Sequence, residues 1–160
     1  MGQLISILTF PGVIIHEFSH EFFCRFLGVR VKKVCYFRFG NPAGYVLHEA
    51  SHYFYQAFFV AAGPFILGSL LSAASFLLSR NENELLREYF WIWIGASIAF
   101  NCLPSRGDAK TLWLENWSHL KRNIFAILGI PFSALIWSLS RLDSVWLRIF
   151  YAGFLFYFTF

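Results

Sequence analysis

Two histidines stand four residues apart, at His16 and His20, inside the first strongly apolar stretch of the chain. Residues four apart share one face of an α-helix, so both imidazoles can point at one metal ion. The residue after His16 is Glu17, and a helical His-Glu-x-x-His pattern is typical of zinc hydrolases, with two histidine ligands and a glutamate that activates water. Ionisable groups are costly in a bilayer unless they are paired, bind a metal or face water. The pattern therefore predicts a zinc site on a helix.

The composition indicates a membrane protein. The chain of 160 residues is 58% hydrophobic and 14% charged, whereas a soluble domain is about half apolar and a quarter charged. We expect an all-α polytopic membrane protein, one membrane-embedded domain over 1–160, with a core at 1–117 and additional helices at 118–160. Hydropathy predicts about five transmembrane helices, at residues 4–27, 52–79, 89–103, 123–140 and 145–160.

The basic residues between the predicted spans indicate an orientation. Nine lie between spans one and two or between spans three and four, and three lie on the opposite side. The positive-inside rule therefore predicts a multi-pass protein whose N-terminus is outside and whose C-terminus and active-site opening are cytosolic. Because these residues cluster between apolar runs and not along one face, no nucleic-acid partner is expected.

One of the predicted cytosolic segments, residues 29–46, is rich in β-branched and aromatic residues and is divided by a turn signal at residues 40–44. This pattern predicts a small membrane-associated β-hairpin after the first helix. The alternative is an irregular basic loop at the membrane surface. A strand edge here would allow an extended peptide to bind by adding a strand.

Two histidines leave zinc short of ligands. Asp108 follows the third span, which runs in the same direction as the first, so its carboxylate is expected on the same side as His20. The alternative is that Asp108 caps a helix beginning near Ala109. On spacing alone both remain open, and the other candidate ligands are His48, His52, Glu21, Glu115, Cys24, Cys35 and Cys102.

The same metal-binding pattern occurs a second time, from His48 to His52. We favour the first pair as the zinc site, because it lies in the middle of a predicted span, where ionisable groups require a function. The second pair begins a span just after a turn, at the water interface, where histidine and glutamate cost little. A site with two metal ions is not excluded by the spacing.

Together these motifs resemble the site-2 proteases, which are membrane-embedded zinc metalloproteases. Four elements match the family in order, and they are Pro11 with the metal motif at 16–20, Gly44-Tyr45-Val46 at the end of the hairpin, Ala-Ala-Gly-Pro at 61–64, and Asn101 with Pro104 and Asp108. The match covers residues 11 to 108. Two departures are that Gly107 precedes Asp108 where the family has a glycine after the aspartate, and that Ala43 replaces the first hairpin glycine.

The resemblance implies an intramembrane zinc endopeptidase that cuts transmembrane-helix substrates near the cytosolic side. It implies one zinc ion per chain, bound by His16, His20 and Asp108, with Glu17 as the catalytic base. Substrate binding is implied for Asn101, Gly44 and Tyr45. The expected partners are a membrane-protein substrate helix and the lipid bilayer.

Two other functions remain open at this stage. The first is a non-proteolytic relative that keeps the zinc as a structural or regulatory element and serves as a membrane scaffold. The second is a metal transporter that uses His16, His20, His48 and His52 as a relay. The substrate and the oligomeric state do not follow from the sequence.

Overall fold

The structure is a computed structural model that describes residues 3–120, 127, 129–142 and 144–160. This part of the chain is mostly helical and contains one small antiparallel sheet. Its elements in order are α1 (Gln3–Leu8), α2 (Phe10–Phe26), β1 (Val31–Cys35), β2 (Tyr45–His48), α3 (Phe54–Arg80), α4 (Leu85–Asn101), α5 (Arg106–Leu120), α6 (Ile130–Arg141) and α7 (Val145–Thr159).

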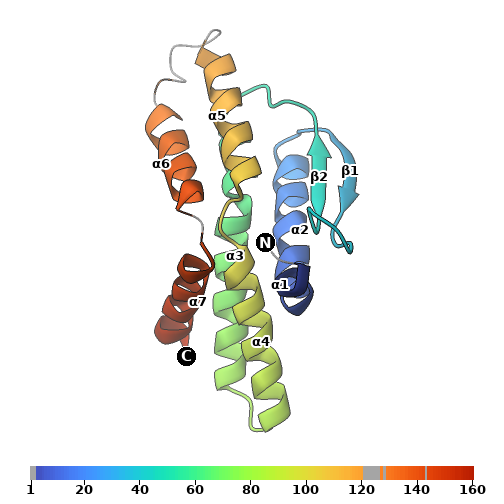
Figure 1. Cartoon of the computed structure of the whole chain (residues 1–160), viewed down its shortest axis with the longest axis vertical. Coiled ribbons are helices and arrows are strands. Elements are labelled where there is room, and N and C mark those ends of the chain that lie inside the picture. The colour runs from blue at the N-terminus through green and yellow to red at the C-terminus, as the bar shows by residue number, and fades with distance from the viewer. Residues whose placement is uncertain (1–2, 121–126, 128, 143) are drawn as a thin grey trace.

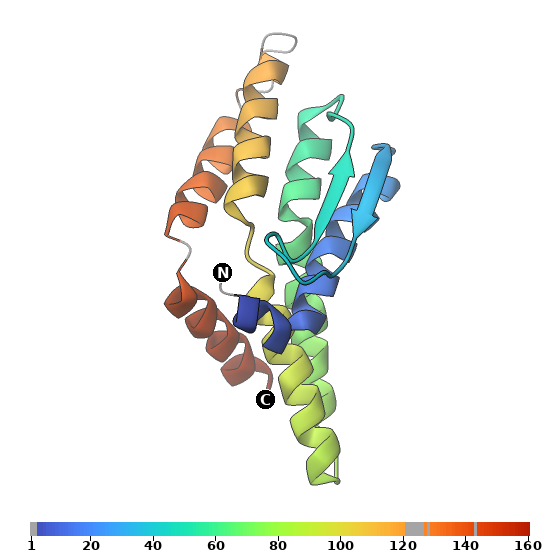
Figure 2. The ribbon, with the colours of Figure 1, turned by 45° about the vertical axis from the view of Figure 1, so that its right-hand side comes forward.

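The helices form columns that run alternately up and down, and α3 is one of these columns (Figure 1). The chain rises through α2, descends through α3, rises again through α4 and α5, and descends through α6 and α7 (Figures 1 and 2). The hairpin of β1 and β2 lies beside α2, on the side away from α6 and α7. This arrangement brings α2 and the start of α5 against the first third of α3, at Ala57, Val60 and Ala61, with the hairpin packed on α2.

The first predicted span, residues 4–27, is divided into two helices. α1 ends at Leu8 and α2 begins at Phe10, with Thr9 between them and Pro11 in the first turn of α2. Proline has no backbone N–H to donate to a preceding turn, but it fits the first turn of a new helix. The metal motif therefore lies on a separate 17-residue helix.

The predicted β-hairpin is confirmed. β1 pairs antiparallel with β2, and Cys35 faces Tyr45 next to the turn. Val29, just before β1, is buried in one cluster with Cys24 of α2 and Val60 of α3, and these apolar contacts fix the hairpin against the helices. The alternative of an irregular loop is therefore wrong.

The segment between the third and fourth predicted spans, expected as a loop, is the helix α5. α4 ends at Asn101, and Pro104 separates it from α5, which begins at Arg106. The sequence offered a helix beginning near Ala109 as an alternative, but α5 begins three residues earlier and includes Asp108 in its first turn. Leu112 of α5 is buried between Ala57 and Ala61 of α3, and this contact holds α5 against the core.

The fifth predicted span, 145–160, corresponds to α7, and the end of the fourth, 123–140, corresponds to α6, while part of the fourth lies outside the described residues. α6 begins at Ile130, with Pro131 in its first turn and not inside the helix. α6 packs on α5 and α7 packs on α4, and the two follow each other in the same direction (Figures 1 and 2). The C-terminus therefore does not lie at the hairpin end of the molecule, where two antiparallel spans would have placed it.

One described helix, α3, is long and apolar enough to cross a bilayer, with 27 residues. Of its most apolar window, 44% is buried inside the protein. The core helix of a soluble protein can meet the same criterion, so this finding supports one possible span and leaves the predicted five as a proposal.

Candidate metal centre

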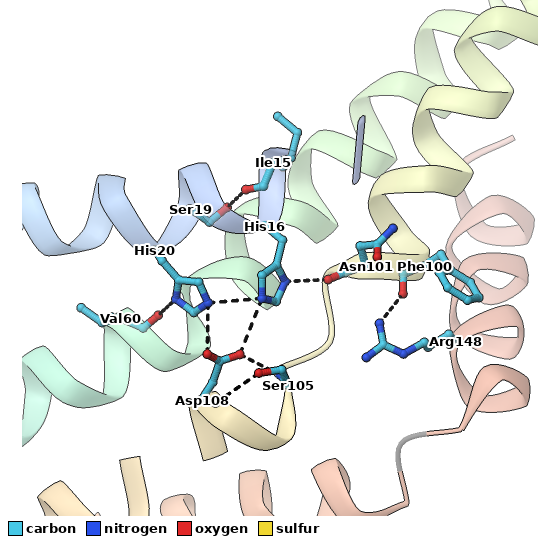
Figure 3. Close-up of polar contacts among 10 residues, drawn as sticks. All are labelled: Ile15, His16, Ser19, His20, Val60, Phe100, Asn101, Ser105, Asp108 and Arg148. Carbon is cyan, nitrogen blue, oxygen red and sulfur yellow. Dashed lines mark hydrogen bonds and ion pairs between the residues drawn. The ribbon is translucent and has the colours of Figure 1, made fainter. Parts of the chain in front are cut away.

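Three predicted ligands from two distant segments meet at one point (Figure 3). His16 and His20 project from α2, and Asp108 projects from the first turn of α5. The two Nε2 atoms are 3.2 Å apart, and Asp108 Oδ1 lies 3.3 Å from His20 Nε2. Asp108 Oδ2 lies 3.6 Å from His16 Nε2. Within the described residues, this is the only group of three or more histidine, cysteine or carboxylate side chains close enough to share a metal ion.

Backbone carbonyls orient both imidazoles. His16 Nδ1 lies 2.7 Å from the carbonyl oxygen of Asn101, and His20 Nδ1 lies 2.8 Å from that of Val60. A carbonyl only accepts hydrogen bonds, so each Nδ1 carries the proton and donates it. The two Nε2 atoms of the neutral rings then present lone pairs toward each other and toward a carboxylate. A metal cation placed between these three acceptors would satisfy all of them.

The spacing of these atoms fits a tetrahedral zinc ion. Zinc binds histidine nitrogen at about 2.0–2.1 Å and carboxylate oxygen at about 2.0–2.2 Å, so tetrahedral ligand atoms lie roughly 3.3 Å apart. The observed separations of 3.2, 3.3 and 3.6 Å match this value closely. The donation from each Nδ1 to a carbonyl is also the outer arrangement that metal-binding histidines usually have. Three protein ligands leave the fourth position for water or substrate.

Asp108 lies in the first turn of α5 and Ser105 is the cap, so the alternative that Asp108 caps a helix beginning near Ala109 is wrong. The backbone N–H of Asp108 donates to Ser105 Oγ at 3.2 Å, and its Oδ2 accepts from the Ser105 N–H at 2.8 Å. This reciprocal pair is a capping box, which stabilises the first turn of α5. The cap also fixes the direction of the carboxylate, which faces the histidines while it accepts from Ser105.

A close contact between α2 and α4 sets the position of His16. A Cβ atom at Gly12 would overlap the carbonyl oxygen of Ser97, so only glycine allows the two helices to approach this closely. The Asn101 side chain is buried, and its Nδ2 donates to the carbonyls of Ser97 at 2.9 Å and Thr9 at 3.3 Å. Asn101 lines the cavity beside the metal centre, but these contacts use its amide to join α4 to α2. Substrate binding by Asn101 stays a prediction.

The hairpin covers the metal helix at Glu17. A Cβ atom at Gly44 would lie 2.6 Å from Glu17 Cγ and 2.8 Å from the Tyr36 carbonyl oxygen. The absence of a side chain at Gly44 therefore lets the turn approach the predicted catalytic base. Gly44 and Tyr45 both line the same cavity as Glu17, so the predicted base and the predicted substrate-binding residues are brought together.

The cavity has a volume of about 430 Å³ and contains the metal centre in its wall. β2 and its preceding turn form one side, and α5 forms the other. The small residues Ala57, Val60 and Ala61 of α3 also line it. The three candidate ligands therefore lie in the wall of a cavity and not in closed packing.

The other candidate ligands, Glu21, Glu115 and the three cysteines, do not belong to the group around His16, His20 and Asp108. Glu21 accepts from Arg25 Nε at 2.7 Å and from the Tyr36 hydroxyl, which fastens the hairpin to α2. This hydrogen bond to a carboxylate raises the pKa of the Tyr36 phenol. Glu115 lines the cavity but is not in the group around His20. The cysteines are free thiols and also lie outside that group.

The second histidine pair does not form a helical motif. His48 ends β2, and His52 lies in a bend before α3. His48 Nδ1 is 2.7 Å from the carbonyl oxygen of its neighbour Glu49, and His52 is exposed. Only His48 of the two lines the cavity. The expectation that this pair begins the second helix is wrong, because α3 starts at Phe54.

Sequence reasoning missed the residues that support the ligands. Val60 acts through its backbone carbonyl, which no sequence pattern reveals. Ser105 could have been found from the spacing Ser-x-x-Asp, which is a capping-box signal. Arg148, which lies in the fifth predicted span, is buried and donates to the carbonyl of Phe100, next to Asn101, at 2.9 Å.

Comparisons of this chain with protein-family models, with curated proteins and with solved structures return no match. The geometry of the site is therefore the basis for any statement about function.

Proposed function

We propose that this protein is an intramembrane zinc endopeptidase that hydrolyses peptide bonds of transmembrane helices near the cytosolic side. The observation that supports the proposal is the convergence of His16 Nε2, His20 Nε2 and the Asp108 carboxylate in the wall of a cavity that Glu17 also lines. A structural zinc site is usually closed by four protein ligands, whereas a catalytic site has three and an open position.

Each residue has a distinct part in the reaction. His16 and His20 would hold a zinc ion through Nε2, and Asp108 would supply the third ligand atom. The ion would supply Lewis-acid chemistry, which activates water and polarises a peptide carbonyl. The Glu17 carboxylate accepts the proton from the attacking water and passes it to the leaving amine nitrogen, as a general base and then a general acid.

The substrate strand is held by the hairpin. The described sheet has two strands in the order β1-β2, so the second edge of β2 has no partner strand there. A helical substrate hides its peptide carbonyls in hydrogen bonds and must unwind before cleavage. Addition of the unwound segment to the β2 edge would satisfy its backbone groups next to Gly44 and Glu17.

The membrane part of the proposal rests on surface chemistry. The last helix, α7, exposes Trp146 by 79%, Phe150 by 72% and Tyr157 by 81%, and such continuous apolar surface is uncommon on soluble proteins. In the proposed orientation the hairpin, with its basic residues, faces the cytosol, and the turn between α3 and α4 faces outside. The N-terminus remains outside, and the C-terminus moves to that side because α7 continues the direction of α6.

Cleavage by a Glu17→Gln protein tests the proposal. The substitution keeps the size of the side chain but removes the proton acceptor, so we expect a loss of about 10²- to 10⁴-fold in cleavage of a reporter transmembrane helix. Zinc content and thermal stability should be unchanged. Glu49→Gln, at the same place in the second motif, is the matched control and should cleave normally.

Full activity of the Glu17→Gln protein would contradict the proposal. A zinc-loaded wild-type protein that cleaves no helical substrate would instead support the non-proteolytic scaffold. Flux of zinc through liposomes that contain the protein would support a transporter.

A further inference from the structure

Glu115 is the third carboxylate residue that lines the cavity, beside Glu17 and Asp108. Its Oε2 atom is buried and has no hydrogen-bond partner in the described part of the chain. A buried polar atom without a partner costs free energy, and an ionised carboxylate costs more than a neutral group. Glu115 therefore brings to the wall of the cavity a carboxylate with one oxygen, Oε2, that makes no hydrogen bond.

Glu115 lies at a defined distance from the metal centre. It follows Asp108 by seven positions on α5, which is two helical turns, so both side chains share one face at a separation of about 10 Å along the axis. On the opposite side of the cavity β2 runs from Tyr45 to His48, three steps that also cover about 10 Å. β2 and α5 run in the same direction in both views (Figures 1 and 2).

His48, at the end of β2, is also a hydrogen-bond acceptor. His48 lines the cavity, and its Nδ1 is 2.7 Å from the Glu49 carbonyl oxygen. Nδ1 therefore donates its proton there, which leaves Nε2 of the neutral ring with a lone pair. Neither Glu115 nor His48 belongs to a group of three metal-ligating side chains in the described residues. A second metal ion at Glu115 would thus have too few ligands, whereas an ammonium or guanidinium group supplies the donor that its carboxylate lacks.

We propose that Glu115 forms a specificity subsite for a lysine or arginine side chain of the substrate. This inference rests on the proposed function and adds a substrate preference to it. An extended peptide advances about 3.3 Å per residue, so a 10 Å separation places the basic residue about three positions from the cleaved bond. In the proposed orientation this is the cytosolic side, where transmembrane helices carry lysine and arginine. The subsite would therefore align the end of a substrate helix with the metal centre.

Peptide binding tests the subsite without requiring cleavage. Zinc-loaded Glu17→Gln protein in detergent is titrated with fluorescent transmembrane peptides that carry either lysine or glutamine, scanned over the positions after the apolar segment. We expect the lysine peptide to bind about 10- to 100-fold more tightly at one position, the range for a hydrogen bond to a charged group. Adding Glu115→Gln should reduce this preference to less than twofold.

Two further variants make the test specific. Glu84→Gln removes an exposed carboxylate that pairs only with Arg87 at the other end of the molecule, and it should keep the full lysine preference. Glu115→Lys should reverse the preference toward a peptide with glutamate at the same position. Because the lysine and glutamine peptides are compared on one protein, the first result does not depend on how well any Glu115 variant folds.

The results separate this inference from the proposed function. If no peptide position shows a preference for lysine, or if Glu115→Gln retains that preference, the subsite is wrong even when the wild-type protein cleaves. If lysine is preferred through Glu115 but the wild-type protein cleaves none of the peptides, the subsite stands and the proteolytic function fails.

Discussion

The chain contains the sequence His-Glu-x-x-His twice, and the two copies have different structures. The first copy, with His16 and His20, lies within α2, and both rings point at Asp108. The second copy, with His48 and His52, begins at the end of a strand and continues through a bend. Within the described residues, the same motif therefore forms a candidate metal centre at the first copy only.

The hydrogen-bond partners explain this difference. The first two rings donate to carbonyls of Asn101 and Val60, which lie on other helices and hold the rings in one direction. In the second copy, Gln56 Oε1 accepts from the backbone N–H of His52 at 2.9 Å and of Tyr53 at 3.0 Å. These bonds cap the start of α3 after the motif, so the motif itself is not helical. The spacing gives a metal site only when a helix and its neighbours orient both rings.

The largest expected effect is on zinc content. His16→Ala or His20→Ala removes one of three ligand atoms, so zinc affinity should fall by more than about 100-fold, beyond the usual effect of losing a residue that only supports a ligand. His48→Ala and His52→Ala should keep one zinc per chain. Metal analysis after dialysis of the purified proteins measures this difference. Equal zinc loss from both pairs would show that the second copy also binds the ion.

The next largest effect is expected at Gly44, where the turn of the hairpin contacts Glu17 of the first copy. Gly44→Ala adds a Cβ atom 2.6 Å from Glu17 Cγ and 2.8 Å from a backbone oxygen, so the turn must move. Since a displacement of about 1 Å at an active site can reduce the rate by 10²-fold, we expect a loss of that size in peptide cleavage. The zinc content should not change, because the ligands are not touched.

Gly40→Ala, four residues earlier, is the matched control. Its new Cβ atom would lie 3.6 Å from the Arg38 side chain, an ordinary contact. Cleavage should stay within about twofold of the wild-type rate, as for most surface substitutions. Equal losses from both alanines would mean that the turn is sensitive throughout and that Gly44 has no particular role beside Glu17.

Elements that local sequence patterns encode could be predicted, whereas features that depend on tertiary contacts could not. The helix at His16 and the hairpin around Gly44 were predictable, because periodicity and turn residues encode them locally. The break after Leu8 was missed, although Pro11 was a local signal for it. The end-to-end arrangement of α6 and α7 depends on packing against α5 and α4, which hydropathy does not report. The carbonyl of Val60 could not be predicted from any pattern.

The smallest effect separates the two roles of Asp108. Ser105→Ala removes the cap of α5 and the hydroxyl that accepts from the Asp108 N–H, so it should cost about 1 kcal/mol of stability and about 10-fold in zinc affinity. Ser144→Ala removes a similar cap, in which Ser144 Oγ accepts from the Leu147 N–H at the start of α7. It should cost the same stability and leave zinc affinity unchanged. Thermal unfolding and competition with a zinc chelator measure the two quantities on the same samples. If the Ser105→Ala and Ser144→Ala proteins have the same zinc affinity, the cap does not orient the carboxylate, and the histidines alone set the geometry of the metal centre.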